Sequence, residues 1–262
     1  TPMEDVEFLA KYQLLRVRQV GGAGTVFEIR CRRTNQLCAT KVMTLQTDQQ
    51  RTSFVKEVAI ASQLSRCKHI VSVKEYFISQ TTGVLVMKMK KTDLLSTLSN
   101  KHKEAPIKPL FRQIVVAIGH CHKRKIAHLD IKPDNILLSS KGSVALCDFG
   151  SAHYFDEPIE RPFGTCFYKA PETRNTLKFN KAAADIWSMG ILLYVLLTGE
   201  YPFQGETERE IAESIQTGRM DFTELLRNRF SPYARELVQQ MLHIRPLARP
   251  TIDDVLDSPF FL

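Results

Sequence analysis

The chain has 262 residues, of which 44% are hydrophobic and 24% are charged. These proportions are those of a folded globular protein that can bury a core, and they exclude disordered, collagen-like and disulfide-scaffold classes. Lysine and arginine number 36 against 28 aspartate and glutamate, which gives a formal net charge of +8. Such a surplus favours anionic partners such as nucleic acid, acidic lipid or phosphorylated ligands, without choosing among them.

The sequence shows no targeting or membrane segment. Its longest uncharged apolar stretch, Ile186–Gly199, is shorter than the roughly 18–20 residues that span a bilayer. The first residues, TPMEDVEFLAKYQ, are mixed and acidic, unlike a signal or transit peptide. The six cysteines form no CxxC pair, which favours reduced thiols over a disulfide framework. We therefore expect an intracellular protein, in the cytoplasm or nucleus, without a membrane span.

The first third of the chain predicts an antiparallel sheet. From Tyr12 to about Lys90, short runs rich in β-branched and aromatic residues alternate with Gly and polar turns. One helical pattern interrupts them, from Arg51 to about Ser65, with apolar residues on one face. These features predict a small β lobe that carries one helix, over residues 1–90.

The remainder, residues 91–262, predicts a larger and mainly α lobe. Helical patterns run from Pro109 to Cys121, from Asp185 to Thr198 and from Pro232 to Leu242. The last of these has Ser231 as a candidate N-cap and proline at its first position. Thr251 and Asp254 form a candidate capping box for a final helix. The predicted class is α+β, with a ligand cleft expected between the lobes.

A dense group of polar residues lies in the stretch HLDIKPDN, residues 128–135. Asp130, Lys132, Asp134 and Asn135 are too polar for a buried strand, yet apolar residues flank them. A loop held between buried anchors suits a catalytic site. An acidic residue again ends an apolar run at Asp148. The side-chain oxygens of Asn135 and Asp148 are ligands of the kind that Mg²⁺ accepts.

Further motifs follow in a fixed order: DFG at 148–150, GTCFYKAPE at 164–172, DIWSMG at 185–190 and Arg249-Pro250. With this set the chain resembles the eukaryotic protein kinase family over essentially its whole length. The resemblance implies a bilobal protein-kinase-like fold in which the two lobes, residues 1–90 and 91–262, form one catalytic domain that uses ATP and Mg²⁺. The closing SPFFL is similar to the end of a kinase domain, so we expect a domain of a longer protein.

The resemblance gives the polar loop its roles. Asp130 would accept or orient the proton of the attacking hydroxyl, and Lys132 would neutralise charge on the transferring phosphate. Asn135 and Asp148 would hold two Mg²⁺ ions.

Other matching residues would position these groups. Lys41, in the run CATK, would contact the α- and β-phosphates, with Glu57 of the predicted helix as its partner. Glu172 and Arg249 are similar to a buried ion pair of the family. Asp185 is similar to the helix residue that hydrogen-bonds the backbone of the catalytic loop.

The predicted phosphate-covering loop departs from the family pattern G-x-G-x-x-G-x-V. The sequence QVGGAGTV, residues 19–26, keeps the second and third glycines but has Gln19 at the first. Backbone amides can still approach phosphates closely where no Cβ intervenes, so we expect altered nucleotide affinity and not its loss. The predicted nucleotide-binding residues are Val20, Gly21, Gly22, Ala23, Gly24, Val26, Ala39, Lys41, Met87, Met89, Leu137 and Asp148.

The second departure is Leu129, where most relatives carry an arginine that binds a phosphorylated residue of the activation segment. The corresponding segment here, residues 151–169, has Tyr154 as its only hydroxyl between Ala152 and Gly164. We therefore expect activity that does not depend on phosphorylation of this segment. Kinases of the myosin light-chain type are similar in having a non-arginine residue there and are regulated by flanking segments. The resemblance thus implies possible regulatory segments or partners outside this chain.

The resemblance also indicates a substrate class. Lys132 in a D-x-K-P arrangement, with Thr165 after Gly164, is similar to the Ser/Thr-specific branch, and implies a protein substrate with Ser or Thr hydroxyls. Thr165 would hydrogen-bond Asp130 and Lys132. Cys147, directly before the DFG motif, would face the nucleotide, or else be a small buried apolar residue.

Two other functions compete with an active Ser/Thr kinase. A pseudokinase scaffold would bind nucleotide without efficient transfer, and the substitutions at Gln19 and Leu129 favour it. The intact charged set, from Lys41 to Asp148, argues against it because a scaffold needs none of these charges. A basic nucleic-acid-binding module would explain the net charge, but the sequence offers no basic recognition helix and no aromatic–basic strand pattern. We therefore expect no nucleic-acid partner.

Overall fold

The computed structural model describes residues 6–22, 24–90, 92–94, 103–139, 142–159, 165–175, 178–218, 220, 223–227 and 230–262. The chain divides into two compact units. The first comprises Thr1–Lys91 together with Asp148–Gly150, and the second Thr92–Cys147 together with Ser151–Leu262. The predicted class, a β-sheet unit and a helical unit in an α+β fold, is confirmed.

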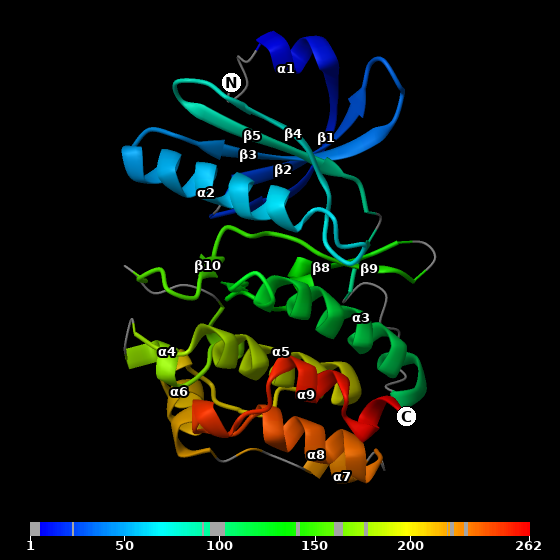
Figure 1. Cartoon of the computed structure of the whole chain (residues 1–262), viewed down its shortest axis with the longest axis vertical. Coiled ribbons are helices and arrows are strands. Elements are labelled where there is room, and N and C mark those ends of the chain that lie inside the picture. Colours follow the sequence, from blue (N-terminus) through cyan, green and yellow to red (C-terminus); the bar gives the residue numbers. More distant parts are fainter. Residues whose placement is uncertain are drawn as a thin grey trace. The chain divides into compact units, whose positions relative to one another are not determined.

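The first unit is a five-stranded antiparallel sheet with two helices. Its elements are α1 (Val6–Lys11), β1 (Tyr12–Gly21), β2 (Gly24–Cys31), β3 (Leu37–Thr44), α2 (Asp48–Leu64), β4 (Val73–Ile78) and β5 (Thr82–Lys88). The strand order is β1-β2-β3-β5-β4, so β1 and β4 form the edges. Figure 1 shows α1 and α2 on opposite sides of this sheet.

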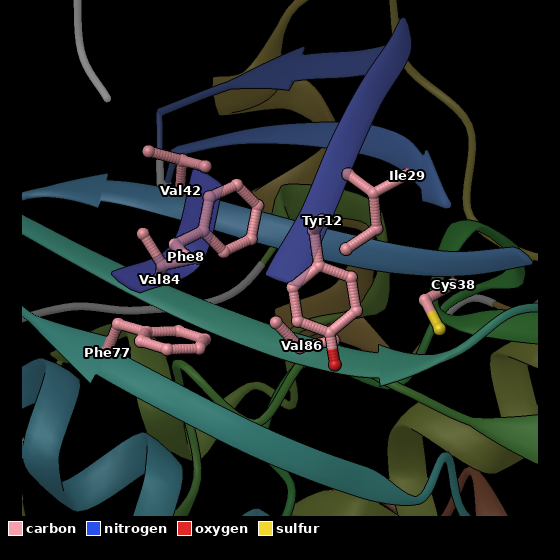
Figure 2. Close-up of a cluster of buried hydrophobic side chains, with 8 residues drawn as sticks. All are labelled: Phe8, Tyr12, Ile29, Cys38, Val42, Phe77, Val84 and Val86. Carbon is pink, nitrogen blue, oxygen red and sulfur yellow. The ribbon is translucent and has the colours of Figure 1, made fainter. Parts of the chain in front are cut away.

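Each face of the sheet buries its own apolar cluster. Because side chains alternate along a strand, Val84 and Val86 of β5 join one cluster and Leu85 joins the other. The α2 face contains Phe54 and Val58 of the helix. The opposite face is covered by α1 and the start of β1, whose aromatic rings lie over the strands (Figure 2). The members of this second cluster are Phe8, Tyr12, Ile29, Cys38, Val42, Phe77, Val84 and Val86.

Helix α2 begins one turn earlier than predicted, at Asp48 instead of Arg51. Thr47 and Gln50 form a capping box, in which the Thr47 hydroxyl accepts from the Gln50 amide and the Gln50 side chain accepts from the Thr47 amide. Such a cap satisfies N–H groups that have no partner within the helix. The polar first turn carries no apolar periodicity, which is why the pattern alone did not include it.

The second unit is mainly helical, with two small sheets of strand order β10-β7 and β6-β8-β9. Its strands are β6 (Thr92–Asp93), β7 (Ile126–Ala127), β8 (Ile136–Leu138), β9 (Val144–Leu146) and β10 (His153–Tyr154). Its α-helices are α3 (Glu104–His122), α4 (Glu172–Asn175), α5 (Lys181–Thr198), α6 (Glu208–Thr217), α7 (Thr223–Arg227), α8 (Pro232–Met241) and α9 (Ile252–Leu256). Short 3₁₀ turns are η2 (Pro133–Asn135), η3 (Cys166–Tyr168), η4 (Pro246–Ala248) and η5 (Pro259–Phe261).

Two helices of this unit begin earlier than predicted. Helix α3 begins at Glu104 and not at Pro109, which lies inside it. Pro106 falls in its first turn, where a proline removes no hydrogen bond within the helix. Helix α5 begins at Lys181 and not at Asp185, since the Asn180 side chain caps it by accepting from the Ala183 amide at 3.0 Å.

Helix α5 forms the centre of the second unit (Figure 1). In the described part of the chain it alone is long and apolar enough to cross a membrane, but 94% of it is buried inside the structure, as in a core helix. Trp187 and Leu192 are both fully buried within it. The predicted caps of later helices are confirmed: Ser231 caps α8, and Thr251 forms a capping box with Asp254 at α9.

Candidate active site

A buried ion cluster lies in the first unit, where Lys41 of β3 meets two carboxylates. The Lys41 Nζ donates to Glu57 Oε1 of α2 at 2.8 Å and to Asp148 Oδ1 at 2.8 Å. The Lys41 and Glu57 side chains are 6% and 2% exposed, whereas Asp148 is 37% exposed. The predicted pairing of Lys41 with Glu57 is present, and Asp148 joins the same ammonium.

The charged groups of this cluster shift the pKa values of one another. Burial alone would lower the pKa of Lys41, but the carboxylates of Glu57 and Asp148 raise it above its ordinary value. Burial raises the pKa of Glu57, and the Lys41 ammonium opposes that rise. Lys41 therefore remains a cation at neutral pH, held on one side by a buried carboxylate and on the other by an accessible one.

The backbone after Cys147 shapes the exposed side of the cluster. Asp148 has φ 61°, a left-handed conformation, and its Oδ1 accepts from the Gly150 amide at 3.2 Å. A Cβ at Gly150 would stand 3.3 Å from both Asp148 Oδ1 and Glu57 Oε2 and 3.4 Å from Lys41 Nζ. The small residue at 150 thus lets the chain pass tightly against the ion cluster.

The predicted phosphate-covering loop is the hairpin between β1 and β2, where Gly21 pairs with Gly24. Gly24 has φ 128°, and a Cβ there would lie 2.4 Å from the carbonyl oxygen of Val42. Only glycine fits this position. Around Gly22, by contrast, nothing lies within 4 Å of a built Cβ. Ala23 of the predicted loop lies outside the described residues.

Strand register brings most of the other predicted nucleotide-binding residues onto one face of the sheet. Val26 is opposite Lys41 in β2–β3, and Ala39 is opposite Met87 in β3–β5. Register partners point to the same face, so these four side chains share it. Val20 in β1 is exposed, Met89 follows β5 and is half-buried, and Leu137 is a half-buried residue of β8 in the second unit.

Sequence reasoning missed a neighbour on this face, Glu28. It is opposite Ala39, is 8% exposed, and accepts from Arg16 at 2.9 Å and Arg18 at 3.4 Å. Period-two alternation from Val26 could have placed Glu28 on the same side. A polar cluster therefore adjoins the predicted nucleotide-binding residues of this face.

The polar loop predicted to be catalytic lies in the second unit, after β7. Its backbone is fixed by Asp185 of α5, which is fully buried. The two carboxylate oxygens of Asp185 accept from the amides of His128 at 2.9 Å and Leu129 at 2.8 Å. Leu129 has φ 63°, a conformation that costs a non-glycine residue about 1–2 kcal/mol. The expected contact between Asp185 and the loop backbone is thus present.

Asp130 is the centre of the loop's hydrogen bonds. Asn135 Nδ2 donates to Asp130 Oδ2 at 3.0 Å and to its carbonyl oxygen at 2.8 Å. Lys132 Nζ lies 2.9 Å from Asp130 Oδ2 and donates to Thr165 Oγ1 at 2.8 Å. The Thr165 hydroxyl in turn donates to Asp130 Oδ1 at 3.1 Å. The predicted bonds of Thr165 to both residues are present, and Asp130 is held as an oriented carboxylate beside an ammonium group.

Each of the two predicted magnesium ligands, taken by itself, offers an oxygen atom that suits Mg²⁺. Because Asn135 directs its NH₂ group to Asp130, its amide oxygen is the side-chain atom that remains for a cation. The carboxylate of Asp148 is accessible in part. Amide and carboxylate oxygens are ligands that Mg²⁺ prefers, and it keeps several places for water and phosphate. Among the described residues no group of three or more His, Cys, Asp or Glu could hold a metal ion.

The end of the activation segment is anchored through α4. Glu172 accepts from Arg249 at 2.7 and 2.8 Å, and the Arg249 side chain is fully buried. The predicted pair is therefore present. Gly164, predicted to begin this stretch, lies outside the described residues. Cys147, the other predicted residue near the site, is half-buried, and the six cysteines of the chain are all free thiols.

Comparison with known proteins agrees with this geometry. The family model described as protein kinase domain matches residues 16–261. The CBL-interacting serine/threonine-protein kinase 20 of Arabidopsis thaliana is 30% identical over 98% of this chain and 60% of its own length. The carbon catabolite-derepressing protein kinase of Candida tropicalis is 28% identical over 97% and 41%. Sperm motility kinase Z of Mus musculus is 30% identical over 98% and 51%. The chain thus spans about half the length of these relatives.

Proposed function

Because the chain belongs to the protein kinase domain family, we propose that it is an active Ser/Thr protein kinase domain. It transfers the γ-phosphoryl group of Mg·ATP to serine or threonine hydroxyls of protein substrates. The family assignment confirms the expected fold and the expected enzyme class, a phosphotransferase. Protein kinase domains in general use ATP and Mg²⁺, and the names of similar proteins support the Ser/Thr branch.

The ion cluster of Lys41, Glu57 and Asp148 is the main observation that supports an active enzyme. Burying such charges costs free energy that apolar residues of similar size would not cost. Their retention supports a catalytic use of the cluster, with Lys41 held by Glu57 to contact the α- and β-phosphates. A nucleotide-binding scaffold needs no such arrangement.

In the proposed mechanism, Asp130 receives the proton of the substrate hydroxyl at its carboxylate. Lys132, held by Asp130 and Thr165, offsets negative charge on the transferring phosphoryl group. Asn135 and Asp148 would hold Mg²⁺, which when bound neutralises charge on the β- and γ-phosphates. Thr165 orients Asp130 and Lys132 together.

We further propose that activity does not require phosphorylation of the activation segment. Leu129 supports this because its side chain is apolar and 5% exposed, and so it offers no guanidinium for a phosphate. Regulation would then come from segments or partners outside this chain. The names of some similar proteins, the CBL-interacting kinases, include such a partner.

Transfer of labelled phosphate from ATP to a mixed peptide library, with Mg²⁺, tests the proposal. The parent domain is expected to label Ser/Thr peptides, and Asp130→Asn and Lys41→Met to lose most of this activity. Asp253→Asn and Lys123→Met, at exposed positions, serve as matched controls. Binding of ATP without transfer by the parent would instead support a scaffold. Pretreatment with phosphatase should leave the rate unchanged, and loss of the rate would refute the proposal about the activation segment.

A further inference from the structure

One cation of the second unit is directed at the activation segment and not at a carboxylate. Arg174 of α4 donates from Nη2 to the carbonyl oxygen of Cys166 at 2.6 Å, and its Nη1 lies 3.6 Å from the Cys166 Sγ. Its Nε is buried without a hydrogen-bond partner in the described structure. Cys166 therefore takes all the hydrogen bonds of this guanidinium among the described residues, although a carboxylate would stabilise it more.

The backbone that carries Arg174 is held in place by an ion pair of the same helix. Glu172, two residues earlier in the same short helix, forms the two-bonded ion pair with the buried Arg249. Helix α4 is thereby tied to the core of the second unit. Because α4 is held in this way, the hydrogen bonds of Arg174 to Cys166 can restrain the segment that precedes the helix.

Cys166 directly follows Thr165 and begins the turn η3. In this turn the Tyr168 amide donates to the Thr165 carbonyl at 3.0 Å, and the Lys169 amide donates to the Cys166 carbonyl at 3.3 Å. Arg174 thus binds the same carbonyl that closes the turn. Because the Thr165 carbonyl accepts within the same turn, a bond that holds the turn also limits the movement of the Thr165 backbone.

We propose that Arg174 is a positioning residue, which holds the end of the activation segment from α4 and so keeps Thr165 against Asp130 and Lys132 without a phosphate. This inference rests on the proposed kinase function and deepens its regulation. Leu129, which precedes the activation segment in the sequence, provides no cation for it. Arg174, which follows the segment, does. The hydrogen bonds between Arg174 and Cys166 form without phosphorylation of the segment.

Arg174→Met and Arg174→Lys test this role, with Arg209→Met as a matched control. Arg209 is 88% exposed and pairs with Glu213 on α6. For Arg174→Met we expect kcat to fall about tenfold or more, because the charge-assisted hydrogen bonds to Cys166 are lost, while the KM for ATP changes less than about twofold. Arg174→Lys should recover part of kcat, since it keeps the charge and a donor. Arg209→Met should match the parent.

Amide hydrogen exchange gives a readout that needs no activity. The amides of Tyr168 and Lys169, which close η3, should exchange about tenfold faster in Arg174→Met than in the parent, well below the melting temperature. Unchanged exchange, or faster exchange with unchanged kcat, would overturn the proposal. If the parent binds Mg·ATP but transfers no phosphate, the kinase function fails, whereas the exchange measurement still decides whether Arg174 holds the turn.

Discussion

Gly24 packs its backbone against the carbonyl group of Val42 so closely that a Cβ at Gly24 would stand 2.4 Å from that oxygen. The third glycine of the loop is therefore required by packing between β2 and β3 as well as by its φ of 128°. The first glycine of the family pattern has no such role here. Gln19 stands in its place as an exposed strand residue paired with Val26.

Two glycine variants separate packing from loop chemistry. Gly24→Ala should displace β2 from β3, lowering the melting temperature and raising the KM for ATP, because both the contact and the backbone conformation resist a side chain. Gly22→Ala, with open space around its Cβ, should leave the melting temperature within about 1 °C. Thermal unfolding and ATP titration of the two variants measure this; equal melting temperatures would contradict it.

The ion pair of Glu172 and Arg249 should dominate the stability of the second unit. Arg249→Met leaves a partly buried carboxylate without its partner and should reduce the free energy of unfolding by about 3–5 kcal/mol. The double variant with Glu172→Leu should recover part of this loss, because no charge is then stranded. Urea unfolding of both variants gives the comparison. A double variant no more stable than Arg249→Met would show that the pair matters only by its shape.

Glu57→Gln should lower activity with little change in fold. The amide keeps the size of the carboxylate but removes half of the charge that holds Lys41. We expect kcat/KM for ATP to fall about tenfold to a hundredfold, as for the loss of one hydrogen bond to a charged group. Steady-state kinetics at several ATP concentrations test this. The control is Glu224→Gln on α7, which should retain the parent rate.

The contact of Glu75 with the N-terminal segment should depend on pH. Burial alone would raise the pKa of Glu75, but the Tyr12 hydroxyl and the Lys11 ammonium hold it below its ordinary value of 4.5. A carboxyl with a lowered pKa in the folded state stabilises the fold above about pH 4.5 and loses this effect as the pH falls further.

Melting temperatures of Glu75→Gln and of the parent measure that dependence. The difference between them should be largest near pH 7 and should shrink as the pH falls below about 4.5, because the unfolded chain takes up its proton there first and the folded carboxyl follows at its lower pKa. Glu7→Gln is the matched control, because Glu7 pairs with the same Lys11 but is 70% exposed. It should change the melting temperature little at any pH. A constant difference for Glu75→Gln would exclude the proposed role of its charge.

The elements with strong periodicity could be predicted from the sequence, and those governed by capping could not. The face of α2 with Phe54 and Val58 follows from apolar spacing alone. Its first turn depends on reciprocal bonds of Thr47 and Gln50, in a stretch without apolar residues. The start of α3 is hard to predict for a similar reason, since Pro109 lies inside the helix although proline is typical of a helix start.

Contacts among the motif residues, such as that of Lys41 with Glu57, could be predicted from the sequence, but contacts with residues outside the motifs could not. Lys41, Glu57 and Asp130 stand in motifs whose order is diagnostic. Glu28 is recognised only when strand register places it beside Ala39. Arg174 lies on a helix that Glu172 anchors, and it binds Cys166. No sequence motif contains this contact.

The buried ring of Phe8 also bears on where the folded unit begins. The family model starts at residue 16, yet Phe8 is 0% exposed and Tyr12 4% exposed, both within the cluster on the sheet face opposite α2. A polypeptide cut to the family boundary would leave Val42, Phe77 and Val84 open to water, and uncovered apolar faces of this kind promote aggregation. Expression boundaries for this domain should therefore follow packing and include the helix before β1.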